Sequence, residues 1–215
     1  MEKIIAPLYW YKDFSFLTAE AIKKINALPA HYDFWNNQIN VISRKDQDKI
    51  WEHHIIHSLV LGNLIPKTKG LRVLDLGTGG GFPGIPLAIA FPEMEFILVD
   101  SVGKKIKVVE EVSAALGLKN LKAAHIRAEK VKGEFDFIVS RAVTTMPDFV
   151  KWVRKKVAKK QQHTLRNGIL YLKGGDLTEE LSLYSSASLY ELAAFFEEDF
   201  FETKKVVHLP LKYKP

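Results

Sequence analysis

Hydrophobic residues in the first third of the chain recur at helical spacing. Between Leu17 and Leu28 they lie three or four positions apart, which is typical of one buried helix face. Pro29 is expected to interrupt this helix, because proline has no amide proton to donate. An aromatic segment at 32–35 follows, and a further helical stretch runs from residue 46 to Pro66. Residues 1–66 are therefore predicted to be mainly helical.

After a short linker at 67–70, apolar runs alternate with helical segments. The runs typical of strands cover residues 72–76, 95–99, 121–126, 135–140 and 169–172, and two further strands are expected within 199–210. Helices are predicted over residues 84–91, 103–116, 147–160 and 176–194. This alternation favours a parallel, doubly wound sheet with right-handed crossovers. The last two strands are close in sequence, which leaves room for one antiparallel pair.

Composition narrows the class of protein. A chain of 215 residues, 47% of them hydrophobic, suits one domain with a small appendage. It has no cysteine, which excludes disulfide scaffolds, thiolate metal sites and thiol nucleophiles. No apolar run is long enough to cross a bilayer, and no signal core follows the first residues. We expect a cytoplasmic monomer that does not enter a membrane.

Charge is segregated along the chain. The 31 basic and 25 acidic residues give a net charge of +6. Residues 149–175 hold eight Lys/Arg and no acid, whereas residues 176–203 hold eight acids and no Lys or Arg. The basic stretch suits a phosphate backbone, but a solvated surface neutralised by its acidic neighbour fits equally well.

The strongest motif lies between the first predicted strand and the next helix. It contains four glycines within residues 77–81, and glycine permits positive φ and close approach of a ligand. Phe82 stands where the dinucleotide fingerprint has its third glycine, and no Gly-Lys-Ser/Thr of a triphosphate loop is present. Asp100 ends the second strand, where a carboxylate can accept hydrogen bonds from ribose hydroxyls. The pattern fits a ligand with ribose but no pyrophosphate, such as S-adenosylmethionine.

Missing motifs exclude other chemistry. Without cysteine, cytosine C5 methylation lacks its nucleophile. The fourth strand ends in Ser140-Arg141-Ala142, not in the Asn/Asp-Pro-Pro-aromatic loop used for exocyclic amines. His53, His54 and His57 have neither a cysteine nor a convincing acidic partner to complete a zinc set, so no metal is expected.

The motifs together resemble a known family, the bacterial small-subunit ribosomal RNA guanine-N7 methyltransferases, also called glucose-inhibited division protein B. The resemblance covers about residues 30–210 and rests on residues 75–86, 100–105, 140–142 and 172–174. It implies an α/β, Rossmann-like class I methyltransferase with a mostly parallel seven-stranded sheet and helices on both faces. Residues 1–66 would form an N-terminal helical cap, and residues 67–215 the S-adenosylmethionine-dependent domain.

The resemblance also implies roles for single residues. The implied S-adenosylmethionine contacts are Gly77, Gly79, Phe82, Asp100 (to the ribose), Ala128 and Glu129 (to the adenine) and Arg141. Arg141 would also face the target base as the catalytic residue, although a structural pairing with Asp75 or Asp100 is an alternative. RNA contacts would come from Lys155, Lys156 and Lys173. The implied partner is 16S ribosomal RNA or the small ribosomal subunit.

Guanine N7 carries a lone pair and no proton, so the implied reaction is a direct displacement that needs neither general base nor metal. Two other functions stay open from the sequence. One is a nicotinamide-dependent oxidoreductase on the same fold, which Phe82 disfavours. The other is an RNA-binding protein that has lost catalysis.

Overall fold

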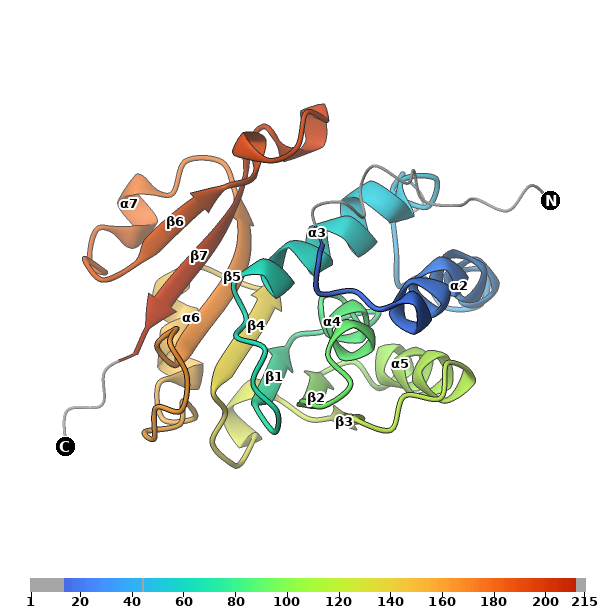
Figure 1. Cartoon of the computed structure of the whole chain (residues 1–215), viewed down its shortest axis with the longest axis horizontal. Coiled ribbons are helices and arrows are strands. Elements are labelled where there is room, and N and C mark those ends of the chain that lie inside the picture. Colours follow the sequence, from blue (N-terminus) through green and yellow to red (C-terminus); the bar gives the residue numbers. More distant parts are fainter. Residues whose placement is uncertain (1–13, 44, 212–215) are drawn as a thin grey trace.

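A seven-stranded, mostly parallel sheet forms the centre of the molecule (Figure 1). The computed structural model describes residues 14–43 and 45–211. The strands are β1 (Arg72–Leu76), β2 (Glu95–Asp100), β3 (Leu121–His125), β4 (Phe137–Arg141), β5 (Gly168–Gly174), β6 (Ser188–Glu191) and β7 (Lys204–Pro210). Their order is β3-β2-β1-β4-β5-β7-β6, in which β7 runs antiparallel to both β5 and β6. The predicted fold class is confirmed.

Helices cover both faces of this sheet (Figure 1). The longer ones are α2 (Ala19–Asn36), α4 (Gly84–Ala90), α5 (Gly103–Ala115) and α6 (Met146–Val153). Shorter pieces are a π-helix (Trp51–Ile56), α3 (His57–Leu59), α7 (Thr178–Leu181) and 3-10 turns at Val60–Asn63, Ala128–Lys130, Leu192–Ala194 and Asp199–Phe201. Among the described residues, no helix is both long and apolar enough to span a membrane.

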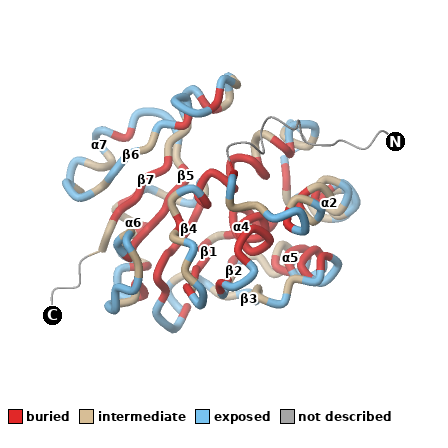
Figure 2. The backbone as a smooth tube through the Cα atoms, viewed as in Figure 1, coloured by how far each residue is buried: buried red, intermediate tan, exposed pale blue. Residues whose placement is uncertain are grey.

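Each strand directs alternate side chains into two hydrophobic layers, one on each face of the sheet. Val73 belongs to the layer shared with α2, α4 and α5, whereas the next residue, Leu74, belongs to the layer shared with α6. Successive side chains of a strand point to opposite faces, so each strand serves both layers. The central strands and α4 are accordingly the most deeply buried part of the chain (Figure 2).

The N-terminal helices share the core of the sheet. Ile25 and Leu28 of α2 belong to the same buried cluster as Leu87 of α4 and Phe96 of β2. The segments before and after residue 66 therefore share one hydrophobic core. The described part of the predicted cap, residues 14–43 and 45–66, packs against one face of the sheet through this common cluster.

Pro29 does not interrupt the first helix, contrary to the prediction. It lies inside α2, which runs without a break from Ala19 to Asn36. Leu28 and Tyr32 on either side are both buried, four positions apart on one face. Their packing outweighs the loss of one backbone hydrogen bond.

The predictions for residues 176–210 are partly wrong. The helix predicted over 176–194 is reduced to α7, and residues 188–191 form the edge strand β6. Four serines within residues 182–188 disfavour a longer helix, because their hydroxyls compete for backbone hydrogen bonds. Only one of the two strands expected within 199–210 is present, since residues 199–201 form a 3-10 turn before β7.

The helix predicted over 147–160 ends at Val153. Val157 leaves the helix path and forms a parallel bridge with Phe135, and both side chains are fully buried. Burial of these two residues in the layer beneath α6 favours the bridge over further helical turns.

Candidate active site

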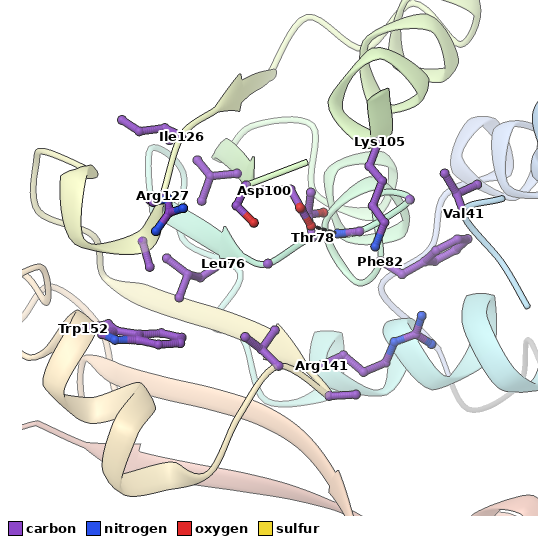
Figure 3. Close-up of a pocket in the computed structure, with 18 of the residues that line it drawn as sticks. Val41, Leu76, Thr78, Phe82, Asp100, Lys105, Ile126, Arg127, Arg141 and Trp152 are labelled. Carbon is purple, nitrogen blue, oxygen red and sulfur yellow. Dashed lines mark hydrogen bonds between the residues drawn. The ribbon is translucent and has the colours of Figure 1, made fainter. Parts of the chain in front are cut away.

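A pocket of about 560 Å³ opens at the carboxyl ends of the parallel strands (Figure 3). Ile126, Arg127 and Trp152 line one end, and Val41 and Phe82 line the other. Every residue predicted to contact the cofactor lines this pocket, namely Gly77, Gly79, Phe82, Asp100, Ala128, Glu129 and Arg141. Open α/β sheets place ligands at this edge because the strand ends and their loops converge there.

The glycine loop has the backbone that its sequence predicts. Gly77 has a φ of 72°, and a Cβ on it would lie 2.5 Å from Cγ2 of Val143. Any side chain there would both strain the backbone and collide with the loop after β4. Gly79 has a φ of 58°, and a Cβ on it would meet no atom within 4 Å. The loop is therefore tight at Gly77 and open towards the pocket at Gly79.

The carboxylate of Asp75 fixes the glycine loop through two hydrogen bonds. Its Oδ2 accepts hydrogen bonds from Thr78 Oγ1 (2.6 Å) and from the Gly84 amide (2.8 Å). A Cβ on Gly84 would lie 2.7 Å from the same oxygen, so the close approach requires glycine. Complete burial raises the pKa of Asp75 to about 7, against the lowering effect of these hydrogen bonds.

Asp100 is held by backbone amides at the end of β2. Its Oδ2 accepts from the Gly79 amide and its Oδ1 from the Val102 amide, both at 2.9 Å. A carboxylate oxygen has two lone pairs, so each oxygen retains one for a ligand. The arrangement can accept two hydroxyl donors, as a ribose provides.

Arg141 leaves the end of β4 and points towards the π-helix of the N-terminal segment (Figure 3). Its Nη1 donates to the His53 carbonyl (2.6 Å), and its Nη2 donates to His54 Nδ1 (2.8 Å). The guanidinium carbon lies 5.5 Å from the centre of the Phe82 ring, within cation–π range. No ion pair joins Arg141 to Asp75 or Asp100, and the guanidinium acts on Asp75 only through its charge at longer range.

Burial determines the charge states around Arg141. It lowers the pKa of Arg141 to about 10, which keeps the guanidinium charged at neutral pH. It also lowers the pKa of His54 to about 3, with a further contribution from the charge of Arg141. His54 is therefore neutral and accepts through Nδ1, because an arginine can only donate.

Two residues of the N-terminal segment that were not predicted as site residues act at the pocket, Tyr32 by holding the glycine loop and Val41 by lining the pocket. The Tyr32 hydroxyl donates to the Gly80 carbonyl (2.6 Å), and its ring lies 4.7 Å from that of Phe82. Val41 packs against Gly80 and lines the pocket. The aromatic segment at 32–35 was a visible signal for Tyr32, but nothing in the sequence paired it with the glycine loop 48 positions away.

The three lysines predicted to contact RNA have different surroundings. Lys155 is exposed. Lys156 is only 9% exposed, and its amine lies 3.5 Å from the Glu129 carbonyl, so it does not lie on an open basic surface as expected. Lys173 is half-buried and forms an ion pair with Glu180 at 2.6 Å. None of the three lines the pocket.

Within residues 14–43 and 45–211, no group of three or more His, Cys, Asp or Glu side chains could hold a metal ion. His53 instead bonds Asp46 through Nδ1 (2.7 Å) and stacks on Phe200 with ring centres 4.0 Å apart. His57 is buried against Phe200 and Phe201.

The fold is similar to that of several solved methyltransferases. TrmN from Thermus thermophilus superposes with a TM-score of 0.56 at 17% identity, covering 73% of this chain and 48% of that one. Precorrin-6y C5,15-methyltransferase from Geobacter metallireducens superposes with a TM-score of 0.55 at 10% identity, covering 73% and 88%. At these identities the similarity concerns the fold alone.

Sequence comparison is more specific. The ribosomal RNA small subunit methyltransferase G of Flavobacterium johnsoniae is 59% identical over 204 residues, covering 95% of this chain and 98% of the relative. The protein of the same name from Bacteroides fragilis is 50% identical over 201 residues, covering 93% and 98%. The family model described as GidB, rRNA small subunit methyltransferase G, matches residues 21–199. The chain therefore belongs to the family of rRNA small subunit methyltransferase G.

Proposed function

We propose that this protein transfers the methyl group of S-adenosylmethionine to N7 of a guanine in 16S ribosomal RNA. The observation that carries the proposal is the pocket itself, which is lined by the open Gly79 backbone, by Asp100 and by Arg141. Family membership supports the reaction class. The bacterial cytoplasm, where ribosomes are assembled, is the proposed location, and a monomer the proposed state.

The residues present fit this cofactor. Asp100 would hold the ribose hydroxyls with its two remaining lone pairs. Ala128 and Glu129 would flank the adenine, at the end of the pocket that Trp152 also lines. Gly77 and Gly79 would allow the amino acid part of the cofactor to approach the backbone, with Phe82 and Arg141 beside it.

The proposed chemistry places few demands on the protein. The bound cofactor would supply an electrophilic sulfonium methyl group, and guanine N7 would attack it with a lone pair that carries no proton. Neither a general base nor a metal is needed. The pocket residues would act by holding the two reactants in line, an effect worth up to about 7–11 kcal/mol in favourable cases.

RNA would approach over the basic stretch beside the pocket. Lys155 and its exposed neighbours on the segment after α6 would contact phosphates. The target base would have to leave its stack to reach the pocket, as base-modifying enzymes generally require.

The direct test combines binding and transfer. Calorimetry should detect S-adenosylmethionine and no nicotinamide dinucleotide, and Asp100→Asn should weaken cofactor binding about 10- to 100-fold through loss of a charged acceptor. Labelled methyl groups should appear at N7 of a guanine in naked 16S RNA or in small subunits. Binding of the nicotinamide cofactor, or a methylated product other than N7-methylguanine, would refute the proposal.

A second measurement tests the RNA surface. The logarithm of RNA affinity should fall linearly with the logarithm of salt concentration, and Lys155→Met should reduce that slope by about one. Lys69→Met is the matched control. Lys69 is an exposed lysine just before β1, so it lies at the amino-terminal ends of the parallel strands, whereas the pocket lies at their carboxyl ends. Equal slopes for the wild type and Lys155→Met would place the RNA elsewhere.

A further inference from the structure

The loop between β4 and α6, residues 142–145, forms part of the pocket wall and is conformationally constrained. Ala142 has a φ of 52°, the one positive value among the described residues other than glycine, and such values are uncommon for a residue with a Cβ. Val143 packs directly on Gly77 and lines the pocket. Because strained backbone persists only where its surroundings hold it, the contacts of this loop need an explanation.

Three side chains hold the loop through its backbone. The Tyr171 hydroxyl accepts from the amides of Val143 (3.1 Å) and Thr144 (2.9 Å) and donates to the Thr144 carbonyl (2.9 Å). The Lys173 ammonium donates to the same carbonyl (2.7 Å) and to Glu180 Oε1 (2.6 Å). Glu180 Oε1 also accepts from the amide of Met146, the first residue of α6.

Lys173 has little capacity left for a phosphate. Its side chain is 12% exposed, and its charge is neutralised by Glu180. Two of its three protons are used in hydrogen bonds, and the ammonium also lies 4.5 Å from the centre of the Tyr171 ring. A phosphate would have to displace an ion pair that is already largely shielded from water.

We propose that Lys173 is a positioning residue, which acts with Glu180 and Tyr171 to fix residues 142–145 against the glycine loop, and that it does not contact RNA. The inference rests on the proposed methyl transfer, since Ala142 and Val143 line the pocket next to Arg141, the residue expected to face the target guanine. A small displacement of an alignment element reduces the rate strongly. Of the cofactor contacts, Gly77 touches this loop through Val143, whereas Asp100, Ala128 and Glu129 lie on other elements, so we expect a smaller effect on cofactor affinity than on kcat.

Hydrogen exchange of the free protein tests the contacts without relying on activity. Lys173→Met and Glu180→Gln should each accelerate exchange of the Thr144 and Met146 amides at least tenfold. Lys205→Met is the matched control, because it breaks a Lys–Glu pair of 3.0 Å on the neighbouring strand and should leave these amides unchanged. Unchanged exchange in Lys173→Met would overturn the proposal.

Kinetics and RNA binding test the positioning role. Lys173→Met and Glu180→Gln should lower kcat by similar factors, of the order of tenfold to a hundredfold, with the cofactor Kd changed less than threefold. The double variant should be no slower than the slower single one, and the salt slope of RNA binding should match the wild type. A slope reduced by about one in Lys173→Met alone would mean a phosphate contact and would refute the inference.

The two proposals fail in different ways. If the wild type transfers no methyl group to guanine N7, the proposed function is wrong, while the exchange measurements still report whether Lys173 and Glu180 hold the loop. If the wild type is active, and the two variants exchange these amides faster but keep the wild-type kcat, then Lys173 and Glu180 do hold the loop and the positioning role is wrong.

Discussion

Arg141 is held by a histidine that has to stay neutral. His54 accepts from Arg141 Nη2 through Nδ1, and a protonated ring would offer a donor and a positive charge to the guanidinium instead. Burial depresses the pKa of His54 to about 3, which preserves the acceptor at neutral pH. The direction of the Arg141 side chain therefore depends on a residue 87 positions away in the chain.

We predict that His54→Leu lowers kcat/KM for methyl transfer about tenfold, because a buried guanidinium proton loses its acceptor. His54→Asn should retain most of the activity, since its side-chain oxygen can take the place of Nδ1. Methyl transfer and urea unfolding of the same samples separate alignment from stability. Equal losses in the two variants would show that the acceptor is not what matters.

Asp75 gives stability a pH dependence of known sign. Its folded pKa is about 7, above the ordinary value of 3.8, so the folded state binds this proton more tightly than the unfolded chain. The contribution of Asp75 to stability is therefore complete below about pH 4 and is lost as the pH rises towards 7.

Replacing Asp75 by asparagine should remove this dependence while keeping an oxygen to accept from Thr78 and Gly84. The free energy of unfolding of Asp75→Asn minus that of the wild type should be larger at pH 8 than at pH 5, so the variant gains stability relative to the wild type as the pH rises. Urea denaturation at both pH values measures the difference. A difference that stays constant would mean that Asp75 does not titrate in this range.

At the level of elements, α2 shows that packing can override a local signal. Pro29 in the helix interior leaves one carbonyl of the preceding turn without its usual donor. Two buried neighbours on the same face, Leu28 and Tyr32, keep the helix continuous. The interruption predicted at Pro29 considered only the backbone and missed this packing.

Pro29→Ala should raise the free energy of unfolding by about 1–3 kcal/mol, because it restores a helical hydrogen bond. Pro147 is a suitable control, since it lies in the first turn of α6, where proline is well tolerated. Pro147→Ala should bring no gain in urea unfolding. A neutral or destabilising Pro29→Ala would indicate that the helix has already adapted to the proline.

Most of the strands that were predicted correctly are buried, although the edge strand β3 was also predicted and has no buried residue. β1, β4 and β5 are inner strands of the sheet and show as mostly apolar runs. β6 is a four-residue edge strand with mostly exposed side chains, so it exists through its pairing with β7 and has no hydrophobic pattern of its own. The same region contained the predicted helix that proved wrong.

At the scale of the whole molecule, the N-terminal segment completes the pocket. The Tyr32 hydroxyl bonds the Gly80 carbonyl, and the π-helix supplies both acceptors of Arg141. The glycine loop and the arginine are thus both oriented by residues of the cap. Cap and sheet are predicted to unfold as one unit, in keeping with their shared core.

Tyr32→Phe should lower the free energy of unfolding by about 1–3 kcal/mol, because the buried Gly80 carbonyl loses its donor. It should also weaken cofactor binding, since the carbonyl belongs to the loop that lines the pocket. Tyr190→Phe is the control, because the Tyr190 hydroxyl makes no hydrogen bond to the described part of the chain. Equal behaviour of the two variants in urea unfolding and calorimetry would contradict the link between cap and loop.

The sequence by itself determined the fold class and the kind of ligand, because those depend on residues close together in the chain. The glycines at 77–81 and the carboxylate at Asp100 specify a turn and a strand end whose positions follow from the order of the elements. Only the tertiary structure determined which groups the side chains of Arg141, Lys156 and Lys173 bond. Their partners are 27 or more positions away, or in one case seven positions away across a turn. A charged side chain is free for a ligand only if packing leaves its hydrogen bonds unused, and packing is a property of the folded chain.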